Sequence, residues 1–174
     1  NPSELKTQDQ IMEAFAKVKR MKLKVEGENV ITLLVDGKGY DESTLSFLEQ
    51  SFGAEQIDEE GNYCDILLQP QTKNALSFLN EAIRKQYITH DQLTMETMQI
   101  QELMQSGRVL CFIGNSANTK ADMSKWISTG AVLASDGSTP VMGKNMRATT
   151  GWISTFIAKS CNNPEKIADF LDYM

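Results

Sequence analysis

Ser116 is the residue of this chain whose setting comes closest to a catalytic one. It lies in the sequence GNSAN at 114–118, directly after the apolar stretch 108–113, as the nucleophile of an α/β hydrolase does. Two features count against a hydrolase. Asn118 replaces the closing glycine of that motif, and the single histidine, His90, precedes the serine, whereas that fold places its histidine last. Without a base the hydroxyl is a poor nucleophile, so we expect no catalysis and retain a small hydrolase using Ser116 as an alternative.

Residues that could hold a metal or a cofactor are few and scattered. The three cysteines are far apart, with no CxxC pair, and the acidic run 58–60 lacks the alternating oxygen spacing of a calcium loop. The sequences GKG at 37–39 and GKN at 143–145 fail as phosphate-binding or dinucleotide-binding loops. We therefore predict neither a metal site nor a cofactor.

Composition narrows the class of protein. The chain has 174 residues, 41% hydrophobic and 23% charged, which fits one globular structural unit. A net charge of −6 disfavours nucleic acid or an anionic membrane surface as a partner, because both need a concentrated basic face. The basic residues of 17–24 are interpreted as the solvated face of an amphipathic helix. No stretch approaches the length of a membrane span, and the first residues do not resemble a signal peptide.

The hydrophobic periodicity predicts helices and strands in alternation. Thr7 and Gln10 form a capping box before the first helix, and Asp41 is expected to cap the second. The expected helices are 7–21, 41–53, 70–87, 96–106, 119–128 and 163–174; the expected strands are 30–35, a hairpin over 55–68, 108–113 and 150–158; 135–150 is expected to be a polar loop. This order indicates an α/β fold with a mixed sheet flanked by helices.

The two tryptophans have different settings. Trp126 is spaced with Met123 and Ile127 as on one face of a helix, which favours core packing. Trp152 follows a glycine and is surrounded by hydroxyl-bearing residues. An aromatic face beside such groups suits a sugar ring, but packing in a core or an interface is an equal alternative.

Three segments, in this order, resemble family 1 extracellular solute-binding proteins, the receptor components of bacterial ABC importers, especially the lipoprotein members of Gram-positive bacteria. They are SGRVLCFIGN at 106–115, GWISTFIAKS at 151–160 and NNPEKIADFLDYM at 162–174. Earlier segments match more loosely, over 7–19 and through 52–63. The resemblance spans nearly the whole chain, but the chain is shorter than such a receptor.

The resemblance implies a non-catalytic protein that binds a carbohydrate in the cleft between two lobes. The chain would be one lobe of a two-lobed periplasmic-binding-protein-like (type II) fold and a fragment of a larger receptor. Residues 1–133 would form the second-lobe core, 134–150 the polar loop, and 151–174 the hinge-return strand and a helix. The expected partners are a mono- or oligosaccharide and the permease of the transporter. The expected location is the outer face of the cell membrane, through a lipid anchor on the full-length monomer.

Ligand contacts implied by the resemblance fall at three places in the chain. The first follows the strand 30–35, the second is the turn after 108–113, and the third is the return strand. The corresponding residues are Asp36, Lys38, Tyr40, Asn115, Ser116, Gly151 and Trp152. Their side chains include hydrogen-bond donors, acceptors and aromatic faces, which suit a polyhydroxylated solute. A protein-interaction domain without a small ligand is a further alternative.

Overall fold

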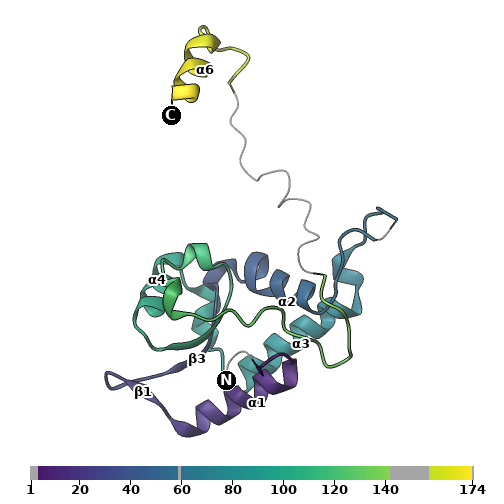
Figure 1. Cartoon of the computed structure of the whole chain (residues 1–174), viewed down its shortest axis with the longest axis vertical. Helices are drawn as coiled ribbons and strands as arrows, with labels where there is room; N and C mark the ends of the chain where they lie inside the picture. Colours follow the sequence, from purple (N-terminus) through teal and green to yellow (C-terminus); the bar gives the residue numbers. More distant parts are fainter. Residues whose placement is uncertain (1–3, 59, 142–156, 174) are drawn as a thin grey trace. The chain divides into compact units, whose positions relative to one another are not determined.

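The computed structural model describes residues 4–58, 60–141 and 157–173, and within them the chain is mixed α/β. The chain divides into two compact units, Asn1–Met142 and Gly143–Met174. Figure 1 shows the elements of the first unit and helix α6 of the second. No helix of the described residues is long and apolar enough to cross a membrane.

The first unit contains four α-helices and four strands among its described residues. The helices are α1 (Gln8–Met21), α2 (Ser46–Ser51), α3 (Pro70–Arg84) and α4 (Thr97–Gln105). The strands are β1 (Lys24–Val25), β2 (Glu28–Asn29), β3 (Ile31–Val35) and β4 (Val109–Ile113). Short 3-10 turns and one π-helical turn, Asp41–Leu45, connect them.

The central sheet is the parallel pair of β3 and β4, with Leu33 opposite Cys111 and Val35 opposite Ile113. The connection between the two strands carries α2, α3 and α4, as a parallel pair requires. A separate antiparallel pair, β1 with β2, forms a small hairpin. The described residues therefore show a parallel and an antiparallel pair, not one continuous mixed sheet.

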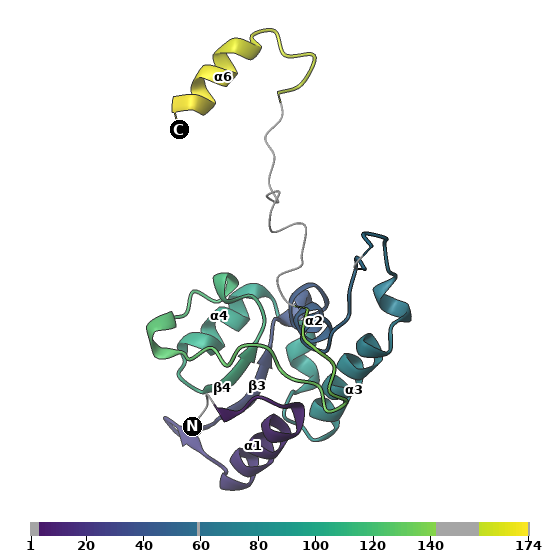
Figure 2. The same cartoon turned by 45° about the vertical axis from the view of Figure 1, so that its right-hand side comes forward.

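Alternate residues of β3 point to opposite faces of the sheet, and both faces are buried. Leu33 and Val35 pack into the main cluster with α1 and α3, whereas Leu34 packs with Ile100 and Met104 of α4. Helices on both faces explain why β3 is a continuous apolar run in the sequence. Figure 2 shows the two strands side by side between these helices.

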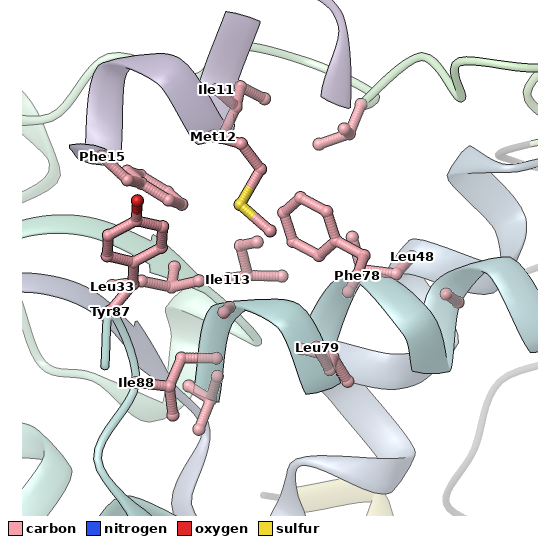
Figure 3. Close-up of a cluster of buried hydrophobic side chains, with 14 of the residues drawn as sticks. Ile11, Met12, Phe15, Leu33, Leu48, Phe78, Leu79, Tyr87, Ile88 and Ile113 are labelled. Carbon is pink, nitrogen blue, oxygen red and sulfur yellow. The ribbon is translucent and has the colours of Figure 1, made fainter. Parts of the chain in front are cut away.

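The main hydrophobic cluster is built around aromatic side chains from α1, α2, α3 and the segment after α3. Figure 3 shows Met12 lying between the rings of Phe15 and Phe78. Phe15 meets Tyr87 edge-on at a centroid separation of 5.6 Å, and Phe78 meets Phe52 in the same way at 6.2 Å. Through this cluster, which also contains Leu33 and Val35, α1 and α3 pack against β3.

Most expected elements of the first unit are confirmed, and three expectations are wrong. Residues 119–128 form no α-helix; the region contains a short 3-10 turn, Met123–Lys125. Lys120, with a φ of 51°, and the cap made by Asp122 interrupt a helix there. The return strand expected over 63–68 is reduced to one bridge, Ile57 to Tyr63, because Asp65 caps a 3-10 helix instead. Asp41 lies inside the π-helical turn and does not cap α2.

The described part of the second unit is residues 157–173, which contain α6 (Pro164–Tyr173). This helix starts at Pro164, as its sequence predicts. Residues 150–156 of the strand expected over 150–158 lie outside the described residues, and Ile157 and Ala158 belong to no strand. Most of the loop expected over 135–150 also lies outside the described residues.

Candidate functional site at the carboxyl ends of the parallel strands

The loops after β3 and β4 meet at the same edge of the sheet, because parallel strands end on the same side. The backbone N–H of Asn115 donates to Oδ2 of Asp36, with a distance of 3.2 Å. The two positions are 79 residues apart in sequence. The structure thus brings together two of the three groups of residues that were expected to contact a ligand. In open α/β sheets this edge is the usual place for ligands.

The hydroxyl of Thr44 joins the ends of the two strands. It accepts a hydrogen bond from the backbone N–H of Asp36 at 3.1 Å and donates one to the carbonyl of Ile113 at 2.6 Å. Thr44 is fully buried, so both backbone groups have their partner without water. The hydroxyl continues the strand pairing one step past the last residue pair of the sheet.

Asp36 is a buried carboxylate, 8% exposed, and one of its oxygens is already occupied by Asn115. Gly114 allows this approach, since a Cβ at that position would lie 2.9 Å from the Cβ of Asp36. This contact holds the turn after β4 in place. Whether Asp36 also contacts a ligand remains a prediction.

Lys38 is exposed, and its Nζ forms an ion pair with Oε1 of Glu96. The backbone N–H of Lys38 donates to the carbonyl of Met95 at 3.0 Å, so the loop after β3 lies against the start of α4. Gly37 makes this contact possible: its φ is +57°, and a Cβ there would collide with the Met95 carbonyl oxygen. Glu96 is therefore a charged neighbour of the site.

Tyr40 is half-buried and packs against the main hydrophobic cluster. Its backbone N–H donates to the carbonyl of Gly37 at 3.1 Å, which closes the tight turn after β3. Contact between its aromatic ring and the core reduces the ring surface that could stack on a sugar.

Asn115 and Ser116 are exposed at the edge of the sheet. Oδ1 of Asn115 accepts from the backbone N–H of Ala117 at 3.0 Å and caps the short 3-10 helix Ser116–Asn118. No described residue accepts from its Nδ2 group, and none bonds the Ser116 hydroxyl. His90 likewise makes no hydrogen bond to Ser116 within the described residues. The turn thus presents an amide donor and a hydroxyl to solvent.

Gly151 and Trp152, the third expected group, lie outside the described residues. Trp126 is partly buried against the smaller cluster of Leu34, Ile100 and Met104, as expected for a packing role, although no helix carries it.

Three residues that support these loops were not predicted from the sequence. Two are Thr44 and Glu96. The third, Gln92, is buried, and its Oε1 accepts the backbone N–H of Val35 at 3.2 Å. Each acts through a contact with a segment distant in sequence: Thr44 and Gln92 bond backbone groups, and Glu96 pairs with the side chain of Lys38. Contacts of this kind leave no local pattern in the sequence. Thr44 stands among other polar residues, in DESTLS at 41–46, so the sequence around it gives no signal either.

Other features of the described residues lie away from this edge. No group of three or more His, Cys, Asp or Glu side chains among them could hold a metal ion. Cys111 lies on β4, where burial raises the pKa of its thiol to about 11 and makes it unreactive. A shallow depression of about 780 Å³ runs along the outer face of α3, past Leu76, Asn80 and Arg84, and contains none of the expected ligand contacts.

Comparisons with protein-family models, with curated proteins and with solved structures found no match to this chain.

Proposed function

We propose that this chain is part of a non-catalytic solute-binding protein of a bacterial ABC importer, a receptor that holds a carbohydrate between two lobes. The family resemblance of the sequence is the first support. The meeting of the loops after β3 and β4 through the Asp36–Asn115 hydrogen bond is the second and carries the proposal. On this view residues 1–133 form most of the second lobe.

The chemistry of the exposed groups suits a polyhydroxylated solute. The Nδ2 group of Asn115 and the hydroxyl of Ser116 have no hydrogen-bond partner among the described residues, whereas Oδ1 of Asn115 already accepts from Ala117. Lys38 adds a cation balanced by Glu96. A sugar hydroxyl both donates and accepts, so it matches such a mixed set. An anionic solute would need more positive charge than these loops supply.

The reading frame upstream of Asn1 gives the first test. The proposal expects a lipoprotein signal with an anchoring cysteine, followed by α/β sequence of about one lobe. A start codon close to Asn1 would contradict the two-lobed receptor and favour an interaction domain.

Binding gives the second test, in the natural gene product that contains this chain. A panel of neutral mono- and oligosaccharides is titrated while the backbone amide resonances are followed by NMR. We expect resonances of the two loops, 36–40 and 114–118, to shift on saturation with at least one sugar. If no sugar shifts these resonances, the proposal is wrong.

A pair of variants tests the role of the turn after β4. Asn115→Asp keeps the oxygen that caps the 3-10 helix and replaces the donor amide by a carboxylate oxygen. Loss of one hydrogen bond should weaken sugar binding by about tenfold. Asn118→Asp is the matched control, since it introduces the same charge in the same exposed turn. Equal weakening by both variants would show a charge effect and not a contact.

A further inference from the structure

Residues 17–24 form a basic patch at the end of α1 and the start of the β1–β2 hairpin, a region visible in Figure 1. Five of these eight residues are Lys or Arg, and none is acidic. They are Lys17, Lys19, Arg20, Lys22 and Lys24. The chain as a whole carries −6, so all of the negative excess lies elsewhere. Positive charge is therefore concentrated in residues 17–24, although the chain as a whole is negatively charged.

The cations of the basic patch are exposed, and Lys19 alone among them has its ammonium group engaged by other described residues. All five side chains are exposed, and no carboxylate among the described residues lies within ion-pair distance of any of them. The Nζ of Lys19 donates to two neutral acceptors, the carbonyl of Lys85 at 2.5 Å and Oε1 of Gln86, and lies 5.9 Å from the centroid of the Tyr87 ring. This contact also brings the end of α3, with the exposed Arg84, next to the patch.

Acidic groups close in sequence do not neutralise the patch. Glu13 and Glu26 flank it without pairing to it, and Glu28 pairs with Arg108 at 3.3 Å. Two cations at the end of α1 are favoured by the helix dipole, but Lys17, Lys22 and Lys24 lie outside its last turn as the structure assigns it. The dipole alone does not account for the cluster.

Two large apolar side chains stand exposed among these cations. Met21 is 56% exposed and Leu23 is 40% exposed, and they alternate with Arg20, Lys22 and Lys24. Apolar side chains among cations suit a partner that has both an anionic surface and an apolar interior. A nucleic-acid backbone would leave Met21 and Leu23 exposed to water. The left-handed conformation of Lys22, with φ 47°, ends the helix α1 between these two apolar residues.

We propose that the basic patch docks on the surface of an anionic phospholipid bilayer. The cations lie at the level of the lipid phosphates, and Met21 and Leu23 enter the layer below them. The inference does not depend on the proposed solute site, which lies at the carboxyl ends of β3 and β4.

Co-sedimentation with vesicles tests the proposal. The 174-residue chain is mixed with vesicles of phosphatidylcholine alone or with phosphatidylglycerol added, at low and at high salt. We expect binding to the anionic vesicles only, reduced by salt because charged contacts are screened. Replacing Lys17, Arg20, Lys22 and Lys24 by Gln should weaken the partition coefficient by about fivefold for each cation removed.

A control with the same net charge separates the patch from the overall charge. It replaces Lys73, Lys120, Lys159 and Lys166 by Gln; all four are exposed and make no ion pair among the described residues. This control should bind as the unaltered chain does. Equal loss in both variants, or no binding to anionic vesicles, would overturn the proposal.

Two further outcomes decide the nature of the partner. Met21→Ser with Leu23→Ser should weaken vesicle binding and leave its salt dependence in place. If these changes leave vesicle binding unaltered, Met21 and Leu23 do not enter the bilayer and the proposal is wrong. If single-stranded RNA binds while vesicles do not, the surface is a polyanion site, which also overturns the proposal.

Discussion

Thr44 shows how one side chain can hold a candidate site together. Its hydroxyl sits between the N–H of Asp36 and the carbonyl of Ile113, where the strand pairing would otherwise end. The carboxylate of Asp36 accepts in turn from the backbone N–H of Asn115. The exposed turn after β4 is therefore positioned by two successive hydrogen bonds, from Asp36 to Thr44 and from Asn115 to Asp36. The position of the exposed groups of Asn115 and Ser116 therefore depends on the buried side chains of Thr44 and Asp36.

Replacing Thr44 by Val should destabilise the chain by about 1–3 kcal/mol, because the buried N–H of Asp36 and carbonyl of Ile113 lose their partner. Urea unfolding measures the change. Thr44→Ser retains the hydroxyl and loses one methyl group, so its cost should stay near about 1 kcal/mol. A Val variant as stable as the Ser variant would show that the bridging hydroxyl contributes nothing.

Glu49 on α2 gives a prediction about pH. Burial raises the pKa of its carboxyl group, and a hydrogen bond with Thr72 offsets part of that rise. The folded state then binds the proton more tightly than the unfolded state. Stability contributed by this group therefore falls as pH rises from about 4.5 through the raised pKa.

Glu49→Gln removes the charge and keeps a polar side chain of the same size. We expect the variant to be more stable than the unaltered chain at neutral pH and equally stable near pH ~4, by urea unfolding at both values. A lower stability at neutral pH would mean that the ionised carboxylate is favourable where it lies.

At the scale of elements, the sequence predicted the helices and strands that carry a local signal, such as a cap, a proline or an apolar run. The helix α1 has a capping box at Thr7, α3 begins at a proline, and β3 and β4 are short apolar runs. The helix expected over 119–128 failed, although its apolar spacing is helical. There Trp126 packs against the smaller cluster from an irregular chain, so tertiary contact replaced local preference.

The candidate site was predictable only in part, for a related reason. That the chain after β3 lies beside the chain after β4 follows from two parallel strands once their pairing is known. The contacts that fix the loops, from Thr44, Gln92 and Glu96, join residues that the sequence separates. Their partners are backbone groups or one flexible lysine, and no spacing rule identifies them.

The loop after β3 depends on a close approach of backbone to backbone at Gly37. Gly37→Ala combines a left-handed φ with a collision against the Met95 carbonyl, and should cost at least about 1–3 kcal/mol. Gly39→Ala is the control, because a Cβ there meets nothing within 4 Å and should change stability by less than about 0.5 kcal/mol. Thermal unfolding of the two variants makes the comparison. Equal melting temperatures would mean that the loop does not need to lie against the start of α4.

At the scale of the whole molecule, the hydrophobic core formed by the described residues lies in the first unit. Both hydrophobic clusters draw all their members from residues 5–134, on the two faces of the β3–β4 pair. Helix α6 of the second unit is amphipathic in sequence but has no buried residue, and Phe170 is 60% exposed. The two units therefore differ in what stabilises them: the first has a hydrophobic core, whereas the described part of the second has the hydrogen bonds of α6 and of one turn, from Cys161 to Ala158.

This difference predicts the effect of removing residues 143–174. Because both clusters lie in the first unit, the chain 1–142 should unfold in one cooperative transition with the urea midpoint of the 174-residue chain. The isolated peptide 157–174 should show little helix by circular dichroism, since a helix of 10 residues is marginal in water without packing. A clearly lower midpoint for 1–142 would mean that residues beyond 142 complete the fold of the first unit, and the exposed apolar side chains of α6 would then be the first positions to substitute.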